Sequence, residues 1–138
     1  MTRRRDAVVC GLILVLMCIV AGCGRGATTL TELHKVKSGL LDVVLLSPRT
    51  ALRHGNDDFI VEFRSADGKL VDVGEVRATA SMPMPGMPMF GTIRVQRTDA
   101  AGRYRADGEF SMAGTWRVAI EFDGPAGKGS VTFSTPVQ

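Results

Sequence analysis

The sequence predicts an all-β fold, an antiparallel β-sandwich of about seven strands. Two observations carry this prediction: short segments alternate apolar and polar residues, and glycine-containing turns separate these segments. About 100 residues follow position 39, which is the length of one immunoglobulin-like sandwich. We therefore expect a single domain over residues 40–138, in which each strand has an apolar face that a second sheet covers.

The alternating pattern sets the bounds of the expected strands. It is clearest in the segment 115–122, where every even-numbered residue is large and apolar. A strand with one buried face has this pattern, so we expect Trp116 in the core. The seven expected strands cover residues 40–46, 58–64, 71–82, 89–97, 103–110, 115–122 and 129–135.

The first 22 residues have the composition of an export signal. A positive segment at residues 3–5 precedes an apolar segment at 7–20, which is shorter than a membrane span needs. The next residues, Val20-Ala21-Gly22-Cys23, resemble the processing site of bacterial lipoproteins, with small residues before the cysteine. This resemblance implies a lipoprotein signal peptide over residues 1–22, cleavage before Cys23 and lipid on that cysteine.

Processing at this site would change the thiols and the charge of the chain. Cys10 and Cys18 would leave with the signal and Cys23 would be acylated, so we expect no disulfide and no free thiol. Removing residues 3–6 from the 17 basic and 14 acidic residues leaves a net charge near +1. Because nucleic-acid binding needs a basic stripe, we expect no nucleic-acid partner. The expected partner is the inner or outer membrane, through the lipid anchor, with the domain facing the periplasm or the cell exterior.

Residues 23–39 are expected to form the lipidated cysteine and a flexible tether, with a helical turn at 30–36. Short antiparallel connections alternate between the two ends of a sandwich. The loops before 58, before 89 and before 115 should therefore share one end, and the tether should enter from the other. We expect the end with these three loops to point away from the membrane.

One of these loops belongs to a methionine-rich segment that holds four of the seven methionines: Met82, Met84, Met87 and Met89. Its centre, Pro85-Gly86, is the favoured central pair of a type II turn. A hairpin turning there pairs Met84 with Met87, and it places all four thioethers on one face. Two-residue hairpins prefer the primed turn types, so a wider loop is the alternative.

The same register, continued along both expected strands, makes the thioether face an extension of the core face. It pairs two apolar positions on each strand and also sets two arginines opposite each other, which is mildly unfavourable. The pairs concerned are Val76 with Val95, Ala78 with Ile93, and Arg77 with Arg94.

Several short motifs follow one another along residues 40–135 in a suggestive order. They are Gly55-Asn56 with Phe59, Asp67-Gly68-Lys69, the segment 82–89, Gly102-Arg103-Tyr104-Arg105-Ala106, and Met112-Ala113-Gly114-Thr115-Trp116-Arg117-Val118. On these residues the chain resembles the FixH/YtkA-like family of small exported domains. The resemblance implies an immunoglobulin-like sandwich near copper or other heavy-metal handling, including efflux systems and the assembly of copper-containing oxidases. The chain departs from FixH proper, which resembles a membrane-spanning protein, by its lipoprotein signal.

Methionine sulfur is soft and uncharged, so it suits Cu(I) or Ag(I), and no proton competes for it. The candidate ligands are Met82, Met84, Met87 and Met89, with Met112 and His54 as further candidates. The alternative is that these methionines fill an irregular end of the core or form an adaptable docking surface. The carboxylates of Asp57 and Asp58 are more typical of caps or solvated charge than of a hard-cation site.

The catalytic inventory is poor, with no nucleophile elbow, no glycine-rich phosphate loop and no histidine pair at metal spacing. We therefore expect a non-catalytic envelope lipoprotein that binds or delivers Cu(I) or Ag(I). The alternatives are a protein-docking accessory subunit of an envelope complex for efflux or oxidase assembly, and a structural accessory lipoprotein.

Overall fold

The structure is a computed structural model that describes residues 28–138, and every regular element in this part of the chain is a strand. The eight strands are β1 (Thr31–Ser38), β2 (Leu41–Ser47), β3 (Gly55–Arg64), β4 (Glu75–Met82), β5 (Met89–Arg97), β6 (Arg103–Phe110), β7 (Gly114–Gly124) and β8 (Gly127–Val137). Among residues 28–138 there is no helix with the length and apolarity that a membrane crossing requires.

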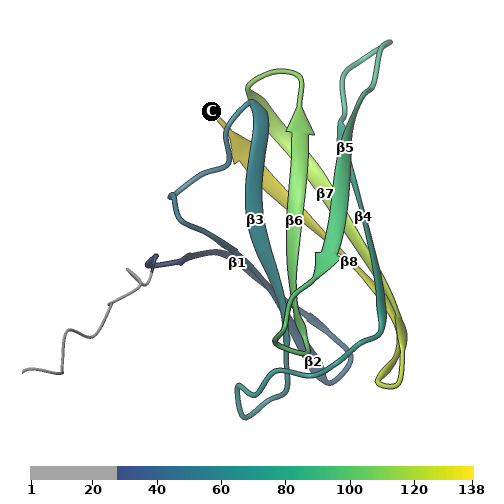
Figure 1. The fold of residues 1–138 in the computed structure, drawn as a ribbon. Helices are drawn as coiled ribbons and strands as arrows, with labels where there is room; N and C mark the ends of the chain where they lie inside the picture. Colours follow the sequence, from purple (N-terminus) through teal and green to yellow (C-terminus); the bar gives the residue numbers. More distant parts are fainter. Residues whose placement is uncertain (1–27) are drawn as a thin grey trace, which may run out of the picture.

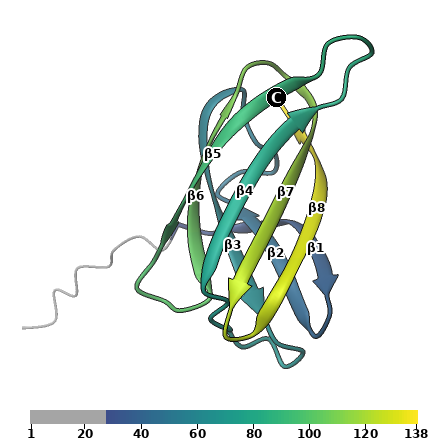
Figure 2. The same cartoon turned by 90° about the vertical axis from the view of Figure 1, so that its right-hand side faces the viewer.

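All neighbouring strands pair antiparallel, in the order β1-β2-β3-β6-β5-β4-β7-β8. Figure 1 and Figure 2 show that this sheet folds over into two layers, which meet where β5 lies beside β4. The series β2-β3-β6-β5 and the series β4-β7-β8 match the two sheets of an immunoglobulin constant-type domain. The predicted immunoglobulin-like sandwich is confirmed, and each of the seven expected strands is present with ends shifted by at most four residues.

The eighth strand is β1, and here the prediction of a tether with a helical turn at 30–36 is wrong. Residues 31–38 pair with β2 along its whole length. The register shifts between Glu32 and His34, which interrupts the alternation that identifies a strand in the sequence. Leu33 and Val36 are half-buried and pack against the core, so β1 belongs to the folded domain.

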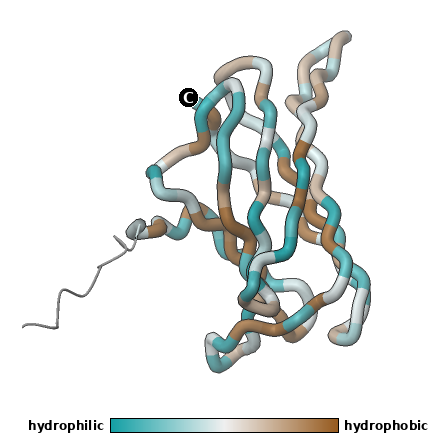
Figure 3. The backbone as a smooth tube through the Cα atoms, viewed as in Figure 1, coloured by the Kyte–Doolittle hydropathy of each residue, from teal (hydrophilic) through white to brown (hydrophobic). Residues whose placement is uncertain are grey.

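The core lies between the two layers and is rich in aromatic side chains. Trp116 is fully buried, as expected, and its ring meets that of Phe110 edge to face at 5.4 Å between centroids. Phe63 forms similar contacts with Tyr104 at 5.6 Å and Phe122 at 5.1 Å. Figure 3 shows that β3 is mostly hydrophilic in the half that starts at Gly55 and mostly hydrophobic in the other half.

The edge strands β1 and β8 approach each other without forming a ladder. The ring of His34 on β1 lies 5.7 Å from the ring of Phe133 on β8. Burial in this seam lowers the pKa of His34 below its ordinary value. The seam therefore contains a histidine that is harder to protonate in the folded protein than in the unfolded chain.

Candidate functional site at the methionine hairpin

Three loops meet at one end of the sandwich, as expected from the sequence. Strand pairing establishes this arrangement, because Gly55 at the start of β3 pairs with Phe110 at the end of β6. Figure 1 shows the β6–β7 loop and the β4–β5 connection at the top of the molecule, with the β4–β5 connection projecting furthest, and the β2–β3 loop rising along the left side to the start of β3. The loops are residues 48–54 between β2 and β3, 83–88 between β4 and β5, and 111–113 between β6 and β7.

The chain does not enter the sandwich from the opposite end, and this premise of the sequence analysis is wrong. Thr31, the first residue of β1, pairs with Ser47, the last residue of β2. Ser47 leads directly into the loop 48–54. Because β1 is an additional antiparallel strand, the chain enters the sandwich at the start of β1. This point lies beside the last residue of β2, at the same end of the sandwich as the loop 48–54.

The hairpin itself has the predicted register at its base. Met82 pairs with Met89, and the ladder between β4 and β5 continues to the pair Thr79 and Thr92. Gly86 has a φ of +79°, as the third position of a type II turn requires. Residues 83–88 lie outside both strands, so the expected pair of Met84 with Met87 is not part of the ladder and the wider loop is present.

The predicted extension of this register toward the middle of the sandwich is wrong. From Ile93 onward β5 pairs only with β6, and below Thr79 the strand β4 pairs only with β7. The strands separate because β5 leaves one layer for the other. Three expected pairs are therefore absent from the ladder: Val76 with Val95, Ala78 with Ile93, and Arg77 with Arg94.

The four methionines of the hairpin differ widely in their exposure to solvent. Met82 is only 7% exposed, and Met89 is half-buried against the core. Met84 is 41% exposed and Met87 73% exposed. Side chains alternate in register only while the ladder continues, so beyond Met82 and Met89 the loop turns its methionines to solvent.

Two other exposed apolar side chains lie at this end of the sandwich. Met112, in the loop between β6 and β7, is 41% exposed, and Phe90 on β5 is 76% exposed. Sequence reasoning identified Met112 but missed Phe90. Since Phe90 neighbours Met89 on a predicted strand, its outward position could have been found from the alternation alone.

His54, one of the further candidate ligands, contacts the C-terminal residue of the chain. Its backbone N–H donates to the carbonyl oxygen of Gln138 at 2.8 Å, and its Nδ1 lies 3.1 Å from the same oxygen. These contacts tie His54 to the C-terminal end of the chain.

Asp57 stabilises the loop between β2 and β3, which agrees with its prediction as a cap. Its carboxylate accepts hydrogen bonds from the side chain of Arg49 at 2.5 Å and from the backbone N–H of Arg53 at 2.9 Å. Asp58 faces solvent and pairs with Arg105 at 3.5 Å. The two neighbouring carboxylates thus have separate partners.

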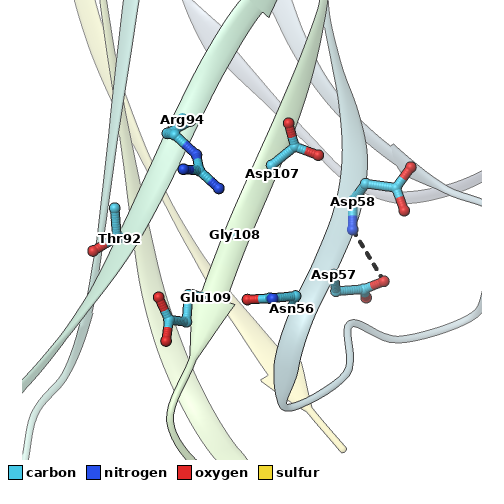
Figure 4. Close-up of a pocket in the computed structure, with 8 residues that line it drawn as sticks. All are labelled: Asn56, Asp57, Asp58, Thr92, Arg94, Asp107, Gly108 and Glu109. Atoms are coloured by element: carbon cyan, nitrogen blue, oxygen red, sulfur yellow. Dashed lines mark hydrogen bonds between the residues drawn. The ribbon is translucent and has the colours of Figure 1, made fainter.

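A polar hollow of about 370 Å³ lies across β3, β6 and β5, and sequence reasoning did not anticipate it. Figure 4 shows Arg94 reaching from β5 toward Asp107 on β6, with Glu109 on the same strand as Asp107 and Asp58 beyond it on β3. Only the pairing of β5 with β6 brings Arg94 opposite Asp107. Within residues 28–138 no three His, Cys, Asp or Glu side chains are grouped so as to hold a metal ion, so the hollow offers mixed charge without a ligand set.

The predicted signal peptide over residues 1–22 and the lipidation site at Cys23 lie outside the described residues. Both stay predictions from the sequence.

Comparison with known proteins identifies the family. The family model described as YtkA-like matches residues 35–121, which is more than half of the chain. No curated protein matches the chain. One similar solved structure is the Lin-41 filamin domain, at 18% identity and a TM-score of 0.46, with 64% of this chain and 81% of that chain covered. The sequence resemblance is confirmed by the family model, and the chain belongs to the YtkA-like family.

Proposed function

We propose that this chain is a non-catalytic lipoprotein of the cell envelope that binds or delivers Cu(I) or Ag(I) through its methionine hairpin, in copper or heavy-metal handling. The observation that carries the proposal is the exposure of Met84 and Met87 on either side of the turn at Pro85-Gly86. Their sulfurs are accessible, uncharged and soft, and such donors select Cu(I) over harder cations. Thioethers also bind without releasing a proton, which suits a compartment open to changes of pH.

The lipid anchor would keep this site near a membrane. Cys23 precedes β1 by so few residues that the connection spans at most about 29 Å when fully extended. Since β1 begins beside the last residue of β2, this connection joins the domain at the end of the sandwich where the loop 48–54 lies. A membrane-bound donor or acceptor of metal would therefore lie within reach of the domain.

A second candidate function is protein docking, with the methionine end as the interface of an accessory subunit in an efflux or oxidase-assembly complex. Phe90 favours it, because this exposed ring has no sulfur or nitrogen donor for a metal. Of the six large apolar residues exposed between residues 28 and 138, four lie at the hairpin end: Met84, Met87, Phe90 and Met112. Adaptable methionines around an aromatic anchor are common in docking surfaces.

Chelator competition under reducing conditions separates the two functions. The purified protein should bind Cu(I) and Ag(I) and bind Zn(II) poorly. The double change Met84→Leu and Met87→Leu should abolish that binding while the fold is retained, because leucine nearly matches methionine in volume. Phe90→Leu is the matched control and should bind Cu(I) as the wild type does.

Docking predicts the opposite pattern. The wild type would then bind Cu(I) no better than an unrelated protein that contains methionine. Capture of an envelope partner would survive the leucine changes and fail with Met84→Gln, Met87→Gln or Phe90→Ser, since apolar contact would be the property that the partner requires.

A further inference from the structure

One buried side chain contacts both segments that carry exposed methionines. The indole Nε1 of Trp116 donates a hydrogen bond of 3.0 Å to the backbone carbonyl oxygen of Met112. The same ring lies beneath the base of the hairpin, where a Cβ on Gly91 would stand 3.2 Å from the indole Cζ3. Trp116 is fully buried and is fixed from a third side by Phe110. It therefore sets the position of the loop 111–113 relative to β4 and β5.

Met82 provides the second link between these segments. Its terminal methyl group occupies the space beside Gly114, since a Cβ there would lie 2.6 Å from this methyl and 3.5 Å from the sulfur. Gly114 has a φ of +145°, a conformation that residues with a Cβ rarely adopt. Met82 thus packs the end of β4 against the end of the loop 111–113, and its thioether is used in the core.

We propose that the soft-metal site combines two segments, with the thioethers of Met84 and Met87 from the hairpin and that of Met112 from the loop 111–113. In this arrangement Trp116 is the positioning residue for Met112, and Met82 is a packing residue and not a ligand. The inference rests on the proposed function and deepens it by naming the ligands. A loop held by a hydrogen bond from a buried ring loses less conformational freedom when it binds a ligand than a free loop would.

The exposed fractions support this division of roles. A ligand needs a sulfur that the ion can reach. The exposed fraction of each of Met84, Met87 and Met112 is two-fifths or more. Met82 is almost completely enclosed. Moving its sulfur to a metal would remove its methyl from Gly114 and open a cavity there, which costs stability.

The test labels the methionine methyl groups of the purified protein with ¹³C and titrates Ag(I), which is diamagnetic, under nuclear magnetic resonance. The methyl signals of Met84, Met87 and Met112 should shift together and saturate with the same midpoint, while that of Met82 should stay in place. Chelator competition should show that Met112→Leu weakens Ag(I) binding by about tenfold or more, a loss of roughly 1.4 kcal/mol. Met82→Leu is the matched control and should change the affinity by less than about twofold.

Trp116→Phe tests the positioning role, because it keeps an aromatic ring in the core and removes the N–H donor. We expect Ag(I) affinity to fall by roughly tenfold, as for other residues that orient a ligand, with a smaller shift of the Met112 methyl signal. Wild-type affinity in a folded Trp116→Phe protein would contradict the positioning role. If this variant fails to fold, the wild-type methyl shifts still decide which methionines are ligands.

The remaining outcomes separate the inference from the function on which it rests. Ag(I) binding that shifts the Met82 signal, or that leaves Met112 unmoved, overturns the inference alone. A wild type that binds neither Ag(I) nor Cu(I) overturns the proposed function and the inference together.

Discussion

The base and the tip of the methionine hairpin have the same residue type and opposite environments. At the base, Met82 pairs with Met89 in the ladder and packs against Gly114, with Trp116 beneath the same strands. At the tip, Met87 lies beyond the ladder and is the most exposed methionine among the described residues. The difference shows that the end of the backbone ladder divides a symmetric motif into a packing part and an accessible part.

The largest expected effect comes from removing the ring beneath the base. Trp116→Ala should lower the free energy of unfolding by about 3–5 kcal/mol, because a large buried side chain leaves a cavity that the sandwich cannot close. Urea denaturation followed by circular dichroism measures this loss. A decrease below about 1 kcal/mol, typical of a surface position, would mean that the ring does not support the base.

The next prediction compares the two parts of the motif directly. Met82→Ala should cost about 2–5 kcal/mol of unfolding free energy, as other truncations in a packed core do. Met87→Ala should stay within about 0.5 kcal/mol of the wild type, because the residue is largely in solvent. Denaturation midpoints of the two variants give the comparison, and equal losses would contradict the division into base and tip.

Glycines test the same division at the backbone. Gly91→Ala at the base places a Cβ 2.6 Å from the carbonyl oxygen of Glu109, which is held in a strand, so we expect a loss of about 1–3 kcal/mol. Gly86→Ala at the tip meets no neighbouring atom and suffers only its positive φ, at a cost of about 1 kcal/mol.

Tryptophan fluorescence provides the second measurement for this glycine pair. The spectrum should change with Gly91→Ala, because the added methyl presses on Trp116, and should stay unchanged with Gly86→Ala. An unchanged spectrum in a folded Gly91→Ala protein would place the ring elsewhere than beneath the base.

The smallest expected effect concerns pH and contrasts the tip with the seam between β1 and β8. Burial lowers the pKa of His34, so near its ordinary value of 6.5 the unfolded chain binds more protons than the folded protein. Stability should therefore be greatest above pH 6.5 and fall as the pH decreases through this value. Thermal midpoints between pH 8 and pH 5 should show the decrease in the wild type and a smaller one in His34→Asn.

Metal binding at the tip should not follow this dependence. Thioethers have no proton to lose between pH 8 and pH 5, so the proposed Ag(I) affinity should stay constant while the protein remains folded. An affinity that falls together with stability would indicate that a titrating group, and not sulfur alone, binds the ion.

Seven of the eight strands could be predicted, because most of them alternate apolar and polar side chains and β2 is a short apolar run that ends before a loop. β1 could not, since its register shift between Glu32 and His34 interrupts the alternation and its residues are only half-buried. This single missed strand reversed the expected direction from which the chain enters the sandwich. The error shows that the position of a tether depends on the number of strands as well as on their pattern.

Within the candidate site, local chemistry determined the turn at Pro85-Gly86 and the pairing of Met82 with Met89, because proline and glycine restrict φ and side chains alternate along strands. The accessibility of each thioether was decided only by tertiary structure. The ladder ends where β5 passes from one layer to the other, and this crossing depends on its pairing with β6. The contacts of His54 with Gln138 likewise join residues far apart in the sequence, and a periodic pattern along one strand contains no information about such neighbours.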